Sequence, residues 1–272
     1  MSVPSTRHIA HYERVLGTSM EIQIVGDPEA AVAAEEAALV EIDRLEAIFS
    51  AYADDSEFSR WERTFDEDVP VSAELAHVLV EAERWREATG GAFDPVMAHG
   101  GGPRWSVRGE TARRLTPRKA SLHALAKGYI VDRAAEVAAA VAGVEAVLLN
   151  VGGDLRHVGP DPVRVAVADP FAPHENAEPL ARVTVRNGGV ATSGTYRRGP
   201  HLIDPRTGAP ADRVASATVV APRAADADAL ATALFVLPPR EGLALADRLD
   251  LSALLVLSDR KRKANRAWRR IT

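Results

Sequence analysis

The alternation of apolar and polar residues predicts the first elements of the chain. Residues 15–25 alternate at the period of two that is typical of a half-buried strand. Asp27 followed by Pro28 then predicts a helix start, with the Asp side chain as N-cap, and the helical period continues to about Phe49. Ser72 begins a second helix, which ends at a pair of glycines.

The rest of the chain mixes short strands with helices. Residues 97–120 show no clear period, and we expect them to be mainly loop. Because the elements do not alternate strictly as βαβ units, the pattern favours an α+β fold with mixed, largely antiparallel sheets and packed helices over a doubly wound fold. The expected elements are helices over 126–143, 225–236 and 240–248, and strands near 146–151, 163–168, 181–186, 216–221 and 253–257.

Composition excludes several classes of function. The net charge of −5 gives no sign of the clustered basic face of a nucleic-acid-binding domain. The chain has no Cys, which excludes disulfides, zinc–thiolate sites and thiol nucleophiles. Residues 1–7 lack the apolar region of a secretory signal, and no apolar run is long enough to span a bilayer. We therefore expect a cytoplasmic protein without a membrane span.

The richest candidate chemistry lies in residues 186–235. Residues 187–198 and 201–208 are dense in Gly, Pro, Ser and Thr, as in connections that carry functional groups on a rigid frame. Asp228 and Thr232 are four residues apart, so on a helix they share one face. Two oxygen-bearing side chains on a helix otherwise made of Ala and Leu make a hard cation a plausible ligand.

Each of these residues also has an ordinary structural explanation. Thr192 and Ser193 precede a Gly and are suited to a turn. Asp204 precedes a Pro, which is a common way to begin a turn. His201 can be a hydrogen-bonded loop histidine, and Asp228 can cap the helix that follows it. Individually, none of these residues decides the function.

Several short motifs nevertheless occur in a specific order along the chain. In that order they resemble the FAD:protein FMN transferases, known as the ApbE family, over about residues 16–257. The resemblance implies an ApbE-like, T-fold-related flavin transferase architecture. The matching motifs are Leu16-Gly17-Thr18, Phe49-Ser50-Ala51-Tyr52 with Asp55-Ser56-Glu57, Gly91-Ala92-Phe93-Asp94-Pro95, Ala126-Lys127-Gly128-Tyr129 with Asp132, Asn150-Val151-Gly152-Gly153-Asp154, Ala191-Thr192-Ser193-Gly194, His201-Leu202-Ile203-Asp204-Pro205-Arg206-Thr207-Gly208 and Ala227-Asp228-Ala229-Leu230-Ala231-Thr232.

The resemblance implies a reaction in which FAD is bound with Mg²⁺, its pyrophosphate is cleaved, and FMN is moved to a Thr or Ser hydroxyl of a partner protein with release of AMP. Such chemistry depends on charge neutralisation, which a cation held by oxygen ligands supplies. By the family pattern, the metal ligands are the Ala126 carbonyl, Asp228 and Thr232. His201 matches the group that takes the proton of the acceptor hydroxyl, because a histidine pKa lies near neutral pH. Asp204 either orients His201 or helps to hold the metal.

The contacts to FAD are also implied by the resemblance. Tyr52 is expected to pack against the isoalloxazine or its edge, and Thr192 and Ser193 to lie near the phosphates. Gly152 and Gly153 allow the backbone to approach the ligand because they have no Cβ. The full set of implied FAD-binding residues is Tyr52, Asp94, Lys127, Asp132, Gly152, Gly153, Asp154, Thr192 and Ser193.

Two features depart from the family pattern. A run similar to Asp-Leu-Gly-Gly is replaced here by residues 121–125, so that His123 stands where a Gly is usual. His123 either reshapes the pocket or serves as an additional functional imidazole. The segment between Asp94 and Ser121 is shorter than usual and carries three consecutive glycines at 100–102, which affects the lid and edge contacts to FAD.

The expected organisation is a flavin transferase domain over residues 15–258, with an N-terminal extension at 1–14 and a solvated basic tail at 259–272. The expected partners are FAD and an acceptor protein that carries the Thr or Ser, with no nucleic acid. Two alternatives stay open for the same site. One is an FAD pyrophosphatase, in which water replaces the protein hydroxyl, and the other is a non-catalytic flavin-binding protein.

Overall fold

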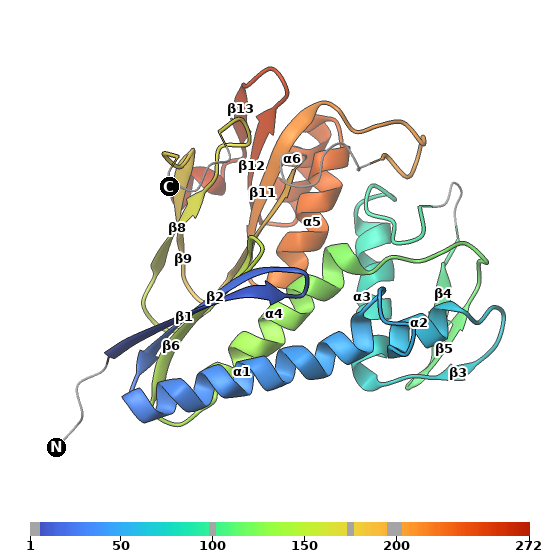
Figure 1. Cartoon of the computed structure of the whole chain (residues 1–272). Helices are drawn as coiled ribbons and strands as arrows, with labels where there is room; N and C mark the ends of the chain where they lie inside the picture. The colour runs from blue at the N-terminus through green and yellow to red at the C-terminus, as the bar shows by residue number, and fades with distance from the viewer. Residues whose placement is uncertain (1–5, 98–101, 173–176, 195–202) are drawn as a thin grey trace.

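An eight-stranded antiparallel sheet lies at the centre of the computed structural model, which describes residues 6–97, 102–172, 177–194 and 203–272 (Figure 1). All the strand pairs described in the chain are antiparallel, which confirms the α+β prediction. In spatial order the central strands are β1 (Thr6–Val15), β2 (Thr18–Gly26), β6 (Val144–Val151), β7 (Asp154–Val158), β10 (Gly189–Gly194), β11 (Val214–Ala221), β12 (Ser252–Leu257) and β13 (Arg262–Ala264).

The two faces of this sheet are covered differently. Helices α1, α4 and α5 pack on one face, and the hairpin of β8 (Val163–Val167) and β9 (Ala181–Val185) packs on the other (Figure 1). Among the described residues, no helix is both long and apolar enough to cross a membrane. The helices are α1 (Pro28–Phe49), α2 (Glu57–Glu62), α3 (Ala73–Ala88), α4 (His123–Ala139), α5 (Ala224–Val236) and α6 (Pro239–Arg248), followed by a 3₁₀ turn at Trp268–Arg270.

The helix starts agree with the capping residues in the sequence. Asp27 accepts a hydrogen bond from the backbone N–H of Glu29 at 3.0 Å and is the N-cap of α1. Ser72 accepts one from the N–H of Leu75 at 3.1 Å and caps α3. Each cap pairs one of the backbone donors that the first turn of a helix leaves without a partner. Both predicted N-caps are therefore confirmed.

Two segments expected to be loop contain strands. Part of residues 97–120 forms β4 (Trp105–Val107) and β5 (Thr111–Arg114), which join β3 (Val69–Pro70) in a small sheet. These strands have two to four residues, too few to show a period in the sequence. Thr192 and Ser193, interpreted as loop residues, lie in β10, where pairing with β7 and β11 overrides their preference for turns.

Both ends of the described chain belong to the sheet. The expected extension at 1–14 supplies most of β1, which pairs with β2 from Thr6 onward. The expected basic tail supplies β13, which pairs with β12. Trp268 is only 4% exposed and packs with the β8–β9 side of the core. The backbone of residues 262–271 is thus anchored to the sheet, while the charged side chains of this segment are exposed to solvent.

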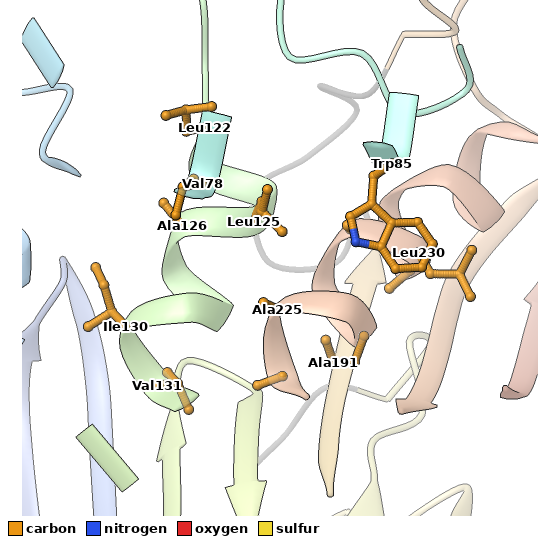
Figure 2. Close-up of a cluster of buried hydrophobic side chains, with 14 of the residues drawn as sticks. Val78, Trp85, Leu122, Leu125, Ala126, Ile130, Val131, Ala191, Ala225 and Leu230 are labelled. Carbon is orange, nitrogen blue, oxygen red and sulfur yellow. The ribbon is translucent and has the colours of Figure 1, made fainter. Parts of the chain in front are cut away.

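Close backbone contacts fix the position of α5 against α4 and β10. A Cβ at Gly128 would lie 2.6 Å from the Ala224 carbonyl oxygen, and one at Gly189 would lie 2.3 Å from the Ala224 backbone nitrogen. Only glycine fits at such distances. Figure 2 shows the buried side chains beside this contact, among them Ala126 of α4, Ala191 of β10 and Leu230 of α5. The second turn of α4 and the first turn of α5 are thus in direct contact.

Candidate active site

One polar cluster lies where α5 packs on β10. The hydroxyl oxygen of Ser193 is 3.1 Å from that of Thr232. Asp228 lies one helical turn before Thr232, and only 7% of it is exposed. Since the described part of α5 is otherwise almost entirely apolar, these groups form a local polar site on a buried helix. Asp228 lies inside α5, so it is not the cap of this helix.

The neighbouring Thr192 points to the other face of the sheet. Its hydroxyl pairs with that of Thr218 on β11 at 2.9 Å. Residues of a strand alternate between the two faces, and Val190 accordingly belongs to the core beneath β8 and β9 while Ala191 belongs to the helix side. Of the two adjacent hydroxyls, the structure places that of Ser193 with α5 and that of Thr192 away from it.

A second polar cluster joins α4 to the β6–β7 hairpin. The Lys127 ammonium lies 2.7 Å from Asp154 Oδ2, and the Asp154 side chain is only 4% exposed. Asp154 follows a two-residue turn made of Gly152 and Gly153, whose φ angles of 60° and 100° favour glycine. Asn150 supports the turn by accepting a hydrogen bond from the N–H of Gly153 at 3.0 Å. The turn therefore presents the Asp154 carboxylate to Lys127.

Gly152 is also required by packing within the protein. A Cβ at this position would lie 2.6 Å from Cγ2 of Thr18, at the start of β2. The N–H of Gly152 donates to the Ser19 carbonyl at 2.9 Å. The close approach that Gly152 permits is thus made to a neighbouring strand.

An exposed pair of aromatic rings lies at the beginning of α4. Tyr52 is 88% exposed, and its ring centre is 5.4 Å from that of His123, with a 32° angle between the ring planes. His123 lies four residues before Lys127 in α4, and the backbone between them is kinked at Ala124. The residue that departs from the family pattern therefore lies against the tyrosine expected to bind flavin.

Asp132, expected to contact FAD, caps α5. Its carboxylate accepts hydrogen bonds from the backbone N–H groups of Ala224 at 2.7 Å and Ala225 at 2.9 Å. The Arg156 guanidinium lies 3.3 Å from the same carboxylate. Burial raises the pKa of Asp132 to about 6, against the opposing effect of the two N–H groups and Arg156. The position of this carboxylate explains why the N-terminus of α5 needs no cap from its own sequence.

Asp94 is held in a buried ion pair. Its two carboxylate oxygens lie 2.5 and 3.3 Å from the Arg104 guanidinium, and its Oδ1 accepts from the Val96 N–H at 2.9 Å. The side chains of Asp94 and Arg104 are 2% and 7% exposed. Asp94 thus fixes the turn that follows α3 and pairs with an arginine from the Gly-rich segment.

Asp204 organises the loop that follows residues 195–202. It forms a two-bond ion pair with Arg206 at 2.9 and 2.8 Å, and its carbonyl accepts from the N–H of Gly208 at 2.8 Å. Hydrogen bonds from Arg206 lower the pKa of Asp204, so the carboxyl is ionised at neutral pH. A Cβ at Gly91 would contact Arg206, which places this loop beside the turn of Asp94. His201 lies outside the described residues.

The donor set on α5 and α4 suits a hard cation. Mg²⁺ in proteins takes oxygen ligands, commonly one or two carboxylates together with waters and substrate phosphates. The buried Asp228 carboxylate, the Thr232 hydroxyl and the backbone carbonyl of Ala126 provide such oxygens. Within the described ranges, no group of three or more His, Cys, Asp or Glu side chains is placed to hold a metal. A cation bound here would therefore need hydroxyl, carbonyl, water or substrate oxygens in addition to carboxylate oxygens.

The residues of these clusters lie within the part of the chain that a family model matches. The ApbE family model matches residues 16–122 and 104–255, which together cover most of the chain. The chain belongs to the ApbE family. The described site residues of the ApbE motifs, from Tyr52 to Thr232, all fall within the matched ranges.

Relatives and solved structures of the ApbE family are similar to this chain over almost its whole length. The FAD:protein FMN transferase of Haemophilus influenzae is 29% identical over 306 residues, covering 93% of this chain and 87% of the relative. That of Vibrio cholerae is 29% identical over 289 residues, covering 89% and 85%. The crystal structure of the ApbE protein from Thermotoga maritima superposes with a TM-score of 0.86 at 25% identity, covering 98% of this chain and 99% of that one.

Sequence reasoning missed two arginines that support the site, and it placed Asn150 in a motif without giving it a role. Arg104 binds Asp94, Arg156 binds Asp132, and Asn150 supports the glycine turn. The Gly-Gly pair before Asp154 was a signal for a two-residue hairpin, and hence for β7. Nothing in the local sequence indicated the two arginines, because their partners are at least ten residues away.

Proposed function

We propose that this chain is a Mg²⁺-dependent FAD:protein FMN transferase that attaches FMN through a phosphoester to a Thr or Ser of an acceptor protein and releases AMP. Family membership and the similarity to FAD:protein FMN transferases support the reaction class. The observation that carries the proposal is the contact of Ser193 with Thr232 one turn after the buried Asp228, where β10 meets α5.

The reaction is a substitution at the FMN phosphorus. The acceptor hydroxyl oxygen forms a bond to this phosphorus, the bridging P–O bond to AMP breaks, and the hydroxyl proton must be removed. We assign the proton acceptor to His201. Asp204 is a weak base because Arg206 lowers its pKa, so its suitable role is to orient a neighbouring group as an anion.

The metal would be held by Asp228, Thr232 and the Ala126 carbonyl. When bound, Mg²⁺ supplies charge neutralisation at the pyrophosphate. Ser193 would orient Thr232 through their hydroxyl contact. Lys127 carries a positive charge on the same helix as Ala126, and Asp154 fixes its ammonium group. We propose that Lys127 contacts FAD, and that Tyr52 packs against its isoalloxazine.

The test is to incubate the full chain with FAD, Mg²⁺ and candidate acceptor domains. Covalent flavin fluorescence on a denaturing gel, with an equal amount of AMP released, is the expected result. Addition of EDTA should abolish both signals, and excess Mg²⁺ should restore them. AMP release without labelled protein would instead indicate a pyrophosphatase. FAD binding without turnover would indicate a flavin-binding protein.

A further inference from the structure

The last residues of the chain carry a net positive charge, whereas the rest of the chain is acidic. Residues 259–272 hold seven Lys or Arg and one Asp, a formal charge of +6. Because the whole chain carries −5, residues 1–258 carry −11. All seven basic side chains are exposed. A strongly positive surface thus lies on an otherwise acidic protein.

This surface is held rigidly. Asn265 Oδ1 accepts hydrogen bonds from the backbone N–H groups of Ala253 at 3.1 Å and Trp268 at 3.0 Å. Trp268 is buried against the β8–β9 side of the core, and the N–H of Thr184 donates to the Ile271 carbonyl at 2.7 Å. A segment whose backbone is already fixed loses less conformational entropy on binding a partner than a loose tail does.

Four of the basic residues lie at the same end of the sheet as the candidate active site. We call Arg260, Lys261, Arg262 and Lys263, at the turn from β12 to β13, the basic hairpin. The N–H of Ser258, just before it, donates to the Arg213 carbonyl at 3.1 Å. Gly194 pairs with Ser216 near the start of β11, so β10 ends where β11 begins and β12 ends. The basic hairpin and residues 203–213 therefore lie at the same end of the sheet (Figure 1).

We propose that the basic hairpin is a docking surface for an acidic segment of the protein that accepts FMN. This inference rests on the proposed function, which requires a protein to approach this end of the sheet. Charges around a site steer a partner of opposite charge and fix its orientation. A flexible acidic segment beside the acceptor hydroxyl would bind the hairpin while the hydroxyl enters the site.

The composition of the surface favours a protein over two other polyanions. An interfacial membrane anchor needs an exposed apolar face next to its basic residues, but Trp268 is buried. Single-stranded nucleic acids bind on exposed aromatic rings, and no Phe, Tyr or Trp in residues 259–272 is exposed. The nearby Phe171 ring is half-buried and is already covered by the Arg260 guanidinium, which lies 4.5 Å from the ring centre. The hairpin therefore offers a partner mainly positive charge.

The test compares two triple variants of the full chain that change the net charge equally. The first is Arg260→Gln, Arg262→Gln and Lys263→Gln, which leaves Lys261 paired with Asp259. The control is Arg7→Gln, Arg14→Gln and Arg164→Gln, three exposed positions on β1 and β8. Fluorescence anisotropy of a labelled octaglutamate peptide measures binding, with phosphatidylglycerol vesicles and a DNA oligonucleotide as competitors.

The expected result is salt-dependent peptide binding that weakens about tenfold in the first variant and stays unchanged in the control. Equal loss in both variants, no binding by the wild-type protein, or stronger binding to vesicles or DNA would overturn the docking proposal. FAD binding without acceptor, monitored by quenching of flavin fluorescence, is measured in parallel and should be equal in all three proteins. Absence of FAD binding by the wild-type protein would count against the proposed function, independently of peptide binding.

Discussion

The Ser193 hydroxyl lies 3.1 Å from the Thr232 hydroxyl and connects β10 to the helix that carries Asp228. In metal sites, groups that orient a ligand typically contribute about 10- to 100-fold to metal affinity or activity. We therefore expect Ser193→Ala to raise the Mg²⁺ concentration needed for half-maximal AMP release by about that factor. Thr232→Val, which keeps the shape but removes the oxygen, should have a larger effect.

Thr232→Ser is the matched control for this pair, because it retains an oxygen at the same position. It should keep most of the activity at saturating Mg²⁺. Full activity of Thr232→Val at low Mg²⁺ would show that Thr232 does not act through the metal.

Variants of Lys127 and Asp154 can show whether Lys127 acts in the reaction or only stabilises the fold. Lys127→Met leaves a carboxylate that is only 4% exposed without its cation, and should lower the free energy of unfolding by about 1–3 kcal/mol. Adding Asp154→Leu should restore most of this stability in urea denaturation, because both charges are then absent. AMP release should remain low in the double variant. If it recovered together with stability, Lys127 would only support the fold.

Asp132 is predicted to affect stability more than FAD chemistry. Asp132→Ala removes the acceptor of the Ala224 and Ala225 N–H groups, so we expect a loss of about 1–3 kcal/mol in urea denaturation. Glu136→Ala, one turn later on α4, should cost less than about 0.5 kcal/mol because Glu136 forms only an exposed pair with Arg133. A similar loss in both variants would contradict the capping role.

The pH dependence of stability should also report on Asp132. Its pKa is raised from 3.8 to about 6 in the folded protein, so between those values the folded state holds a proton that the unfolded chain releases. The contribution of Asp132 to the free energy of unfolding should therefore fall as the pH rises from about 4 to about 6, and be constant above. Asp132→Asn should remove this slope when urea titrations are repeated across the interval.

Tyr52 and His123 can be tested through flavin fluorescence. If the exposed Tyr52 ring stacks on the isoalloxazine, Tyr52→Phe should retain FAD affinity. Tyr52→Leu should weaken it about tenfold, in line with the value of an aromatic contact. His123→Gly removes the ring that lies against Tyr52 and should reduce fluorescence quenching on binding. Unchanged quenching in His123→Gly would place His123 outside the flavin site.

The fold was predictable where local chemistry and periodicity agreed. Asp27 with Pro28 and Ser72 each fixed a helix start, and the apolar run before Gly152 gave β6. The strands from 105 to 114 could not be predicted, because strands this short are determined by pairing with neighbours distant in sequence.

The candidate site was predictable as a set of residues but not as an arrangement. Motif order indicated Lys127, Asp154, Ser193 and Thr232, whose contacts link four separate elements. The opposite orientation of Thr192 follows from its position in β10, which the glycine-rich sequence did not reveal. The capping role of Asp132 depends on a helix that begins some ninety residues later.

The contact of Gly128 with Ala224 has a consequence for the rotation of α4 about its own axis. Successive side chains of an α-helix are rotated by about 100° around the helix axis. Lys127 and Gly128 are adjacent, so only one rotational setting directs the ammonium to Asp154 while presenting the bare backbone to α5. A one-residue insertion between Lys127 and Gly128 would therefore turn the ammonium away from Asp154 or place a side chain against Ala224. The packing of α4 on α5 and the placement of the Lys127 charge therefore depend on the same rotation of α4, and a change that disturbs one disturbs the other.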